Sequence, residues 1–368
     1  MKRSIVGGCA LVLFAAPALA LETEVTLDGH VGFSASHFDN DVDDNTNLHN
    51  NASRLGLEAT ASEGGYTGFL RYERGMDMYN ADSDFDGAAF ETESTNQDFV
   101  REFYAGIDSP YGRVTVGRFR AAYARAGKRV DPFYDTSLAG FSGTASTYGG
   151  QGANYGFSNL TNGFSDRVIE LQSANYSGLS FNGNVYLDRG QENDHDYGAG
   201  VSYAGNAMRD QAFEVSLQYL EIENESAVGV PFRDPSDGSV PSVGGSPGPS
   251  SSFRVSGVYD LGSFSLGANY EYVDVDTEED ARHYSSVTAS IPLNAKLRIA
   301  AAISYLNFPE DGPAIEGFGG TVGAFYEVLD GLNTYGGVRY VDFDENPSSD
   351  GTLALALGAA YSFDLNLR

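Results

Sequence analysis

The chain has 368 residues and a formal net charge of −29, with 51 acidic side chains against 22 lysines and arginines. This balance disfavours nucleic acid as a partner, because phosphate binding requires basic surfaces. After residue 20 no apolar stretch is long enough for a helix to cross a bilayer, which excludes a helical membrane protein. The acidity fits a surface that attracts cations, or a salt-rich habitat.

The first twenty residues have the pattern of a secretory signal peptide. A basic start precedes an apolar run over 5–16 and a small-residue cleavage signal at 18–20. We therefore expect residues 1–20 to be removed and residues 21–368 to form one domain. The only cysteine, Cys9, lies in the removed segment, so the mature chain has no disulfide. An exported chain of this size without disulfides favours a large barrel over a disulfide scaffold.

The rest of the chain alternates between apolar and polar residues with a period of two, which predicts β-strands. Apolar residues share one face in runs that begin at Val25, Leu179, Phe213, Phe264 and Leu353. In the last run the opposite face carries alanine, glycine and serine. Segment counting gives about sixteen strands, a number that suits a barrel with water in its lumen. A soluble sandwich with its apolar face inside would show the same alternation, so periodicity alone leaves both folds open.

The connections between the expected strands alternate in length. Tight turns are expected at 108–111, 260–262 and 330–331, and long polar connections at 79–97, 120–165 and 223–252. Tyr and Phe also cluster near segment ends, where amphipathic rings would meet lipid headgroups. These features predict an all-β, sixteen-stranded antiparallel transmembrane β-barrel.

Alternation also selects charged residues for the inside of the barrel. Arg54 and Glu58 lie opposite the apolar residues of one expected strand, and Arg71 and Glu73 lie opposite those of the next. We expect these four side chains to face the lumen. The alternative is that they are water-facing groups without a specific role.

Five segments resemble, in order and spacing, the Gram-negative general diffusion porins. They are Ser53–Glu58, Val100–Ile107, Gly112–Arg118, Asp131–Phe133 and Ser173–Phe181. The resemblance implies a homotrimer in the outer membrane of a Gram-negative bacterium, surrounded by lipid and lipopolysaccharide. It also implies passive diffusion of small hydrophilic solutes and ions, without a cofactor. The chain departs from the family at its end, Asn366-Leu367-Arg368, where the usual terminal aromatic residue is missing.

The resemblance further implies a third loop, here 120–165, that folds into the barrel and faces basic wall residues across a constriction. Asp131 and Asp135 are the acidic candidates in this loop. Arg101 matches the family's next wall arginine, although Phe103 shares its parity and alternation would not have selected it. Arginines that face carboxylates would create a transverse field that orients dipolar solutes.

Glu170 stands where many relatives carry a basic residue, which makes the expected pore less basic. Together with the acidic balance, this predicts a weak preference for cations. The loop bases Arg120, Arg125, Lys128 and Arg129 act in the opposite direction and have no expected position. By resemblance, Arg118 would lie near the trimer contact.

The loop 79–97 contains a calcium-binding pattern. Asp82, Asp84 and Asp86 alternate before Gly87, and Glu93 follows at the spacing of a bidentate ligand. The flanking segments are expected to be strands rather than helices, so a solvated acidic loop is the alternative. In related porins this loop reaches toward the neighbouring subunit, and a bound Ca²⁺ would there help to hold the trimer.

The sequence contains no motif that indicates catalysis. The five histidines are scattered, and none lies in a zinc or nucleophile motif. Two other classes stay open. One is a substrate-selective channel, for example for a sugar, with stacking by Tyr148, Tyr155 and Phe157. The other is a soluble exported β-rich adhesin or binding protein, with 223–252 as a linker.

Overall fold

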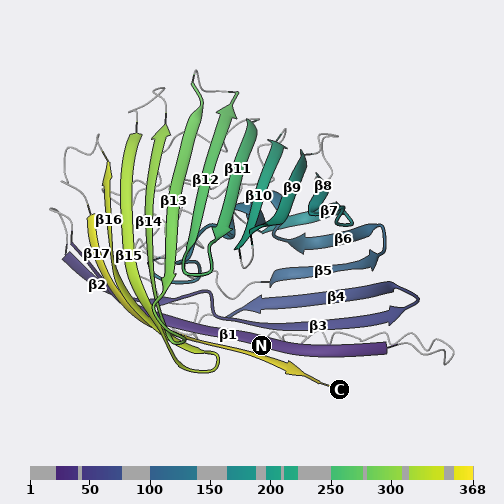
Figure 1. Ribbon diagram of the computed structural model, residues 1–368, viewed down its shortest axis with the longest axis horizontal. Helices are drawn as coiled ribbons and strands as arrows, with labels where there is room; N and C mark the ends of the chain where they lie inside the picture. Colours follow the sequence, from purple (N-terminus) through teal and green to yellow (C-terminus); the bar gives the residue numbers. More distant parts are fainter. Residues whose placement is uncertain are drawn as a thin grey trace, which may run out of the picture.

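The computed structural model describes most of the chain after residue 21 (Figure 1). The described ranges are 22–39, 44–76, 100–138, 164–187, 196–208, 211–222, 250–276, 280–308, 315–343 and 352–367. The predicted signal peptide at 1–20 lies outside these ranges, and so does the whole of the predicted calcium loop at 79–97.

The described residues form strands almost throughout. The first half contains β1 (Glu22–Asp39), β2 (Asp44–Asn50), β3 (Arg54–Glu63), β4 (Tyr66–Gly75), β5 (Val100–Ser109), β6 (Gly112–Phe119), the helix α2 (Ala122–Lys128), β7 (Ser165–Ser173) and β8 (Leu179–Tyr186). The second half contains β9 (Asp196–Met208), β10 (Gln211–Ile222), β11 (Ser250–Asp260), β12 (Ser265–Val275), β13 (Arg282–Pro292), β14 (Leu297–Phe308), β15 (Ile315–Leu329), β16 (Leu332–Phe343) and β17 (Thr352–Asn366). Within the described ranges, no helix is long and apolar enough to cross a bilayer.

The strands close into a barrel. Consecutive strands pair antiparallel from β3 to β17, and β1 pairs with β17 over a register that runs from Thr26 opposite Asn366 to Asp39 opposite Leu353. β2 and β3 both pair with β1 and together form one interrupted barrel strand. The seventeen strands of the described residues therefore build sixteen barrel strands, and the predicted fold class is confirmed.

The interruption between β2 and β3 is held by side chains. Ala52 has a φ of +55°, which breaks the strand geometry. The Ser53 hydroxyl then accepts the Gly32 N–H at 3.0 Å and lies 3.1 Å from the Gly32 carbonyl, so it replaces part of the backbone ladder. The break also lets Asn51 reach across the inner face of the barrel, where its amide donates to the Tyr335 hydroxyl at 2.7 Å.

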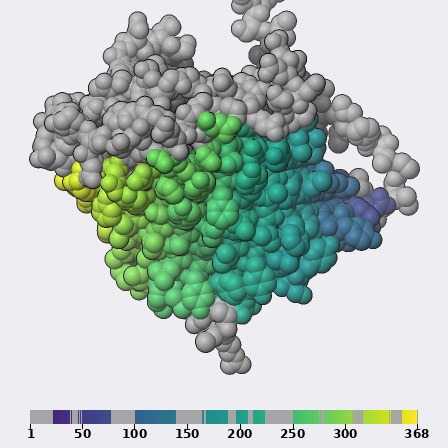
Figure 2. Space-filling model, turned by 90° about the horizontal axis from the view of Figure 1, so that it is seen from above, coloured from purple at the N-terminus to yellow at the C-terminus, as the bar shows by residue number. Residues whose placement is uncertain are grey.

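The apolar face of the strands points outward. Val287, Phe318 and Leu357 are 60%, 52% and 71% exposed, whereas Ser216 and Ser304 on the other face are buried. Figure 2 shows the outer surface over the later strands, drawn in teal to yellow. A soluble sandwich would bury this face in its core, so the soluble alternative does not fit the fold.

Short and long connections lie at opposite ends of the barrel. β15 and β16 are joined through Asp330 and Gly331, and Gly331 has a φ of +78° that glycine adopts without a Cβ clash. By contrast, β4 ends at Gly75 and β5 begins only at Val100. In outer-membrane barrels the short turns face the periplasm, which orients the molecule.

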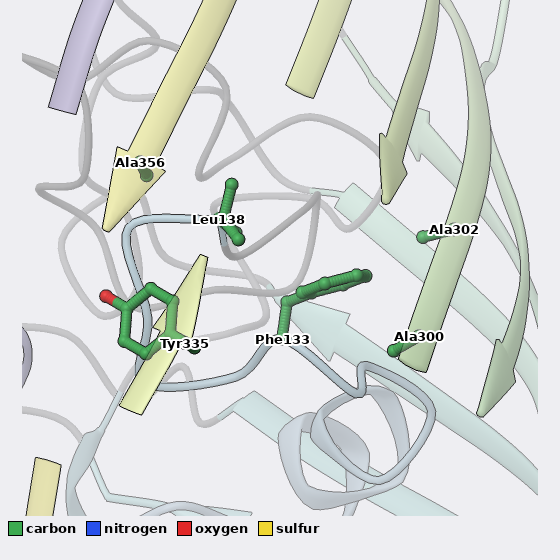
Figure 3. Close-up of a cluster of buried hydrophobic side chains, with 6 residues drawn as sticks. All are labelled: Phe133, Leu138, Ala300, Ala302, Tyr335 and Ala356. Atoms are coloured by element: carbon green, nitrogen blue, oxygen red, sulfur yellow. The ribbon is translucent and has the colours of Figure 1, made fainter. Parts of the chain in front are cut away.

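The described first part of the expected third loop, residues 120–138, folds inward, as expected. Its helix α2 lies against β9, β10 and β11, and the following segment reaches the inner face of β14 to β17. There it forms one hydrophobic cluster, whose members are Phe133, Leu138, Ala300, Ala302, Tyr335 and Ala356. Figure 3 shows the Phe133 ring pointing from the loop toward the β14 alanines. The wall residues are small, which leaves room for the loop side chains inside the barrel.

Candidate functional site

Three arginines on neighbouring strands form a charged cluster on the inner wall, here named the wall cluster: Arg54 on β3, Arg71 on β4 and Arg101 on β5. Arg71 lies at its centre. It pairs with Asp28 on β1, and its other nitrogens lie 3.0 Å from Glu73 and 3.5 Å from Glu102. The predicted lumen residues Arg54, Arg71 and Glu73 are thus brought together.

Arg101 reaches this cluster through a β-bulge. Glu102 pairs with Glu73 and Val100 with Arg74, so Arg101 is an extra residue in β5. A bulge re-aims one side chain, which explains why Arg101 is buried inside while Phe103 is exposed outside. Its Nε lies 2.7 Å from the Glu73 carboxylate.

Gly56 makes space for the central arginine. It lies on β3 between the register positions of Asp28 and Glu73. A Cβ atom at Gly56 would lie 2.5 Å from the Arg71 guanidinium, so any side chain there would displace Arg71 from its carboxylates. Gly56 therefore helps to fix the position of Arg71, because its lack of a side chain leaves room for the guanidinium group.

The inward loop meets the wall cluster through Asp135. Its carboxylate lies 2.9 Å from Arg54, and its backbone φ of +61° belongs to the left-handed region that Asp tolerates better than most residues. Burial opposes ionisation of Asp135, but the nearby Arg54 and Lys128 outweigh it and hold the pKa of this carboxyl below its usual value. Asp135 thus carries a negative charge against the wall.

Two of the basic loop residues, Lys128 and Arg120, lie close to aromatic rings. Lys128 Nζ lies 4.1 Å from the centre of the Tyr134 ring, and the Arg120 guanidinium lies 4.2 Å from that of Phe164. Burial and the nearby Arg120 lower the pKa of Lys128 to about 8. This loop lysine therefore changes its charge in the neutral to mildly alkaline range.

The remaining predicted residues have distinct positions. Asp131 accepts a hydrogen bond from the Phe133 N–H at 2.8 Å and so shapes the loop. Glu170 is buried under α2, where it accepts the Ala122 N–H at 3.0 Å and pairs with Arg125 at 2.5 Å. Arg118 shares the parity of Val116, which is exposed on the outer face, and donates to the Val100 carbonyl. Its role at a trimer contact and the roles of the other residues in a constriction stay predictions.

A buried anchor holds α2 to the wall. Arg254 and Glu271 are both 0% exposed and lie 3.0 Å apart. Tyr123 of α2 fits between them: its hydroxyl donates to Glu271 at 2.8 Å, and its carbonyl accepts from Arg254 at 2.6 Å. We name these three residues the loop anchor. Burial raises the pKa of Tyr123 well above its usual value, so this hydroxyl keeps its proton and stays a donor.

A cavity of about 930 Å³ lies inside the barrel on the periplasmic side of the loop, here named the vestibule. Among the described residues that line it, five are acidic, two are arginines and one is a histidine. They are Asp28, Glu58, Glu102, Asp330, Asp364, Arg54, Arg71 and His30. The predicted lumen residue Glu58 therefore lies at the vestibule wall.

Sequence reasoning missed Asp28, Glu102 and the loop anchor. Asp28 has the parity opposite to Leu27, so the alternation that selected Arg54 could have selected it as well. Glu102 has the parity opposite to Phe103 and pairs in register with Glu73, so the same alternation could have selected it. The anchor joins residues 131 and 148 positions apart, and no local pattern carries such a contact.

Two predicted sites lie outside the described residues: the calcium ligands Asp82, Asp84, Asp86 and Glu93, and the aromatic residues Tyr148, Tyr155 and Phe157. In the part of the chain that the structure describes, no group of His, Cys, Asp and Glu could hold a metal ion. Calcium binding at the loop stays a prediction.

Comparisons with known proteins agree with this architecture. A family model of the Gram-negative porins matches residues 8–346. The anion-selective porin from Comamonas acidovorans has a similar structure, with a TM-score of 0.66 at 15% identity over 93% of this chain and 100% of that chain. A loop-deletion mutant of OmpT from Vibrio cholerae follows with a TM-score of 0.62 at 16% identity, covering 93% and 99%. OmpF from Salmonella typhi, in complex with daunomycin, gives 0.58 at 16% identity, covering 93% and 97%.

A search among curated proteins gives no match. The solved structures share too little sequence to show more than the fold, whereas the family match extends over most of the chain. The closed barrel and this match together show that the chain belongs to the Gram-negative porins and forms a multi-pass β-barrel channel of the outer membrane.

Proposed function

We propose that this channel is a trimer that passes small hydrophilic solutes and ions by passive diffusion and weakly prefers cations. The family and the fold favour a channel rather than an enzyme. Among similar structures, in-vitro folded OmpT of Vibrio cholerae is described in a trimer form, which supports the trimer for this chain.

The acidic vestibule is the observation that carries the preference for cations. Its lining has five carboxylates against two arginines in the described residues. These groups leave the lining with a formal net charge of −3 (five minus two), and Arg71 contacts two of the five carboxylates, Asp28 and Glu102. An acidic cavity with low-dielectric walls raises the local concentration of cations.

Planar-bilayer recording of the detergent-extracted protein under a KCl gradient tests this function. We expect conductance that increases in steps, and a reversal potential with the sign that a cation-selective channel gives under this gradient. The double variant Asp28→Asn/Glu102→Gln removes two negative charges and releases Arg71, so its reversal potential should shift toward the anion side. Glu63→Gln serves as the matched control, because Glu63 is exposed at the β3–β4 turn and does not line the vestibule.

The possible results separate the parts of the proposal. Absence of conductance would reject the channel. A wild-type reversal potential at zero or on the anion side would reject the cation preference alone. A monomer in chemical cross-linking of the detergent-extracted protein would reject the trimer.

A further inference from the structure

A second cavity, of about 240 Å³, lies between α2 and the inner wall of β7 to β11. None of its lining residues lines the vestibule, so the inward loop separates two spaces inside the barrel. We name this second space the helix-side chamber. Its helix side consists of small apolar residues, Ala122, Ala126 and Val130, flanked by Arg125 and Arg129.

The opposite wall of the chamber is polar and uncharged over most of its surface. Its hydroxyl and amide groups belong to Gln172, Ser180, Asn182, Ser202, Ser216, Gln218 and Ser256. These groups combine donors with acceptors, because a hydroxyl and a carboxamide each offer both.

Asn182 and Gln218 form the centre of this wall. Their carboxamides exchange two hydrogen bonds, of 3.1 and 3.2 Å, although β9 lies between their strands. Gly200 of β9 occupies the register position between them, and a Cβ atom there would overlap the Gln218 amide. The glycine therefore permits a direct contact between residues on strands that are not neighbours.

Further hydrogen bonds hold this centre in place. Gln218 donates to Ser216 at 2.8 Å, and Ser202 donates to the same hydroxyl at 3.0 Å. Gln218 is only 2% exposed, so its amide has little freedom to turn. A wall fixed in this way loses little conformational entropy when it binds a solute.

The two arginines of the chamber add no net charge. Arg125 lies 2.5 Å from Glu170, and Arg129 pairs with Glu214. An anion would have to compete with these carboxylates for the guanidinium groups, and a cation would have to compete with the guanidinium groups for the carboxylates. The chamber is therefore better suited to a neutral solute than to an ion.

We propose that the helix-side chamber binds a small neutral polyhydroxylated solute of monosaccharide size. Each hydroxyl of such a solute both donates and accepts, which matches the mixed wall around Gln218. Ala122 and Ala126 of α2, with Val130 just after the helix, contact the C–H face of the solute. The proposal rests on the proposed function in one respect only, namely that solutes enter the barrel.

Isothermal titration calorimetry of the detergent-solubilised full chain with D-glucose tests the proposal. We expect saturable binding that is about tenfold weaker in Gln218→Leu, because the Leu side chain leaves Asn182 unpaired. A smaller loss of glucose affinity is expected for Ser180→Ala. This mild substitution is the test variant if Gln218→Leu does not fold. Glu63→Gln, at an exposed position of the β3–β4 turn that lines neither cavity, is the control and should bind as the wild type does.

Three outcomes would overturn the proposal: absence of saturable glucose binding, equal binding by wild type and both chamber variants, or tighter binding of glycine or acetate than of glucose. Calorimetry requires no bilayer, so its outcome is independent of channel conductance. Bilayer recording of the same preparation separately shows whether the channel function holds.

Discussion

Replacing Glu271 by leucine tests how strongly the buried loop anchor contributes to stability. The substitution leaves the Arg254 guanidinium without its carboxylate at a position with no solvent exposure. Breaking a buried pair by removing one partner typically costs about 3–5 kcal/mol. Arg254 keeps the Tyr123 carbonyl as an acceptor at 2.6 Å, so we expect the lower end of this range, about 3 kcal/mol.

A loss of this size lowers the ratio of folded to unfolded protein roughly 150-fold. Equilibrium unfolding in guanidinium chloride, with the protein in detergent micelles, measures the change in unfolding free energy. The double variant Arg254→Met/Glu271→Leu is the control, because it removes both charges and leaves no buried ion without its counter-charge, although the Tyr123 hydroxyl and carbonyl each lose one partner. It should recover most of the loss.

The single and double variants together decide whether the reasoning holds. Equal losses in the two variants would show that an uncompensated charge is not the cause. A loss below about 1 kcal/mol in the single variant would refute the premise that the pair is shielded from water, since exposed pairs contribute only that much.

Three further predictions follow from the loop and the wall. Protonated Lys128 adds a positive charge below its pKa of about 8, so the cation preference in reversal-potential measurements should rise between about pH 7 and 9, and Lys128→Met should abolish this rise. Phe133→Ala should weaken loop docking by about 3–5 kcal/mol and increase open-channel current noise, whereas Leu355→Ala on the outer face should leave the noise unchanged. Gly56→Val should displace Arg71 and shift the reversal potential, and an unchanged potential would contradict the crowding at this glycine.

The barrel itself was predictable because one physical rule governs every strand. Alternation assigns each residue to one of two faces, and in a bilayer the apolar face must be the outer one. The rule placed Arg54, Arg71 and Glu73 correctly on the inner face. It did not distinguish a barrel from a sandwich, because only the outward direction of residues such as Leu357 separates them.

The positions of individual side chains inside the barrel were harder to predict, since they depend on contacts between segments that are distant in the sequence. The bulge at Arg101 reverses the expected parity, and only the pairing of β4 with β5 reveals it. Glu170 was expected in the pore lining and lies under α2, because a helix that the alternation did not predict covers it.

One signal for the loop was present in the sequence but was not interpreted. The inner face of the last strand is built from small residues, among them Ala356. The inner face of β14 likewise carries Ala300 and Ala302. A wall that faces only water has no need for small side chains. Runs of alanine and glycine with inner parity therefore indicate where an inward loop packs.

The strand break after β2 has a consequence for the order of assembly. Asn51 lies near the start of the barrel and Tyr335 near its end, yet the hydroxyl of Tyr335 accepts the Asn51 amide and also the backbone N–H of Ser137 in the loop. These partners meet only after the first and last strands have joined. The loop therefore obtains its full set of contacts only in the closed barrel, and these contacts tie the seating of the loop to the joining of the first and last strands.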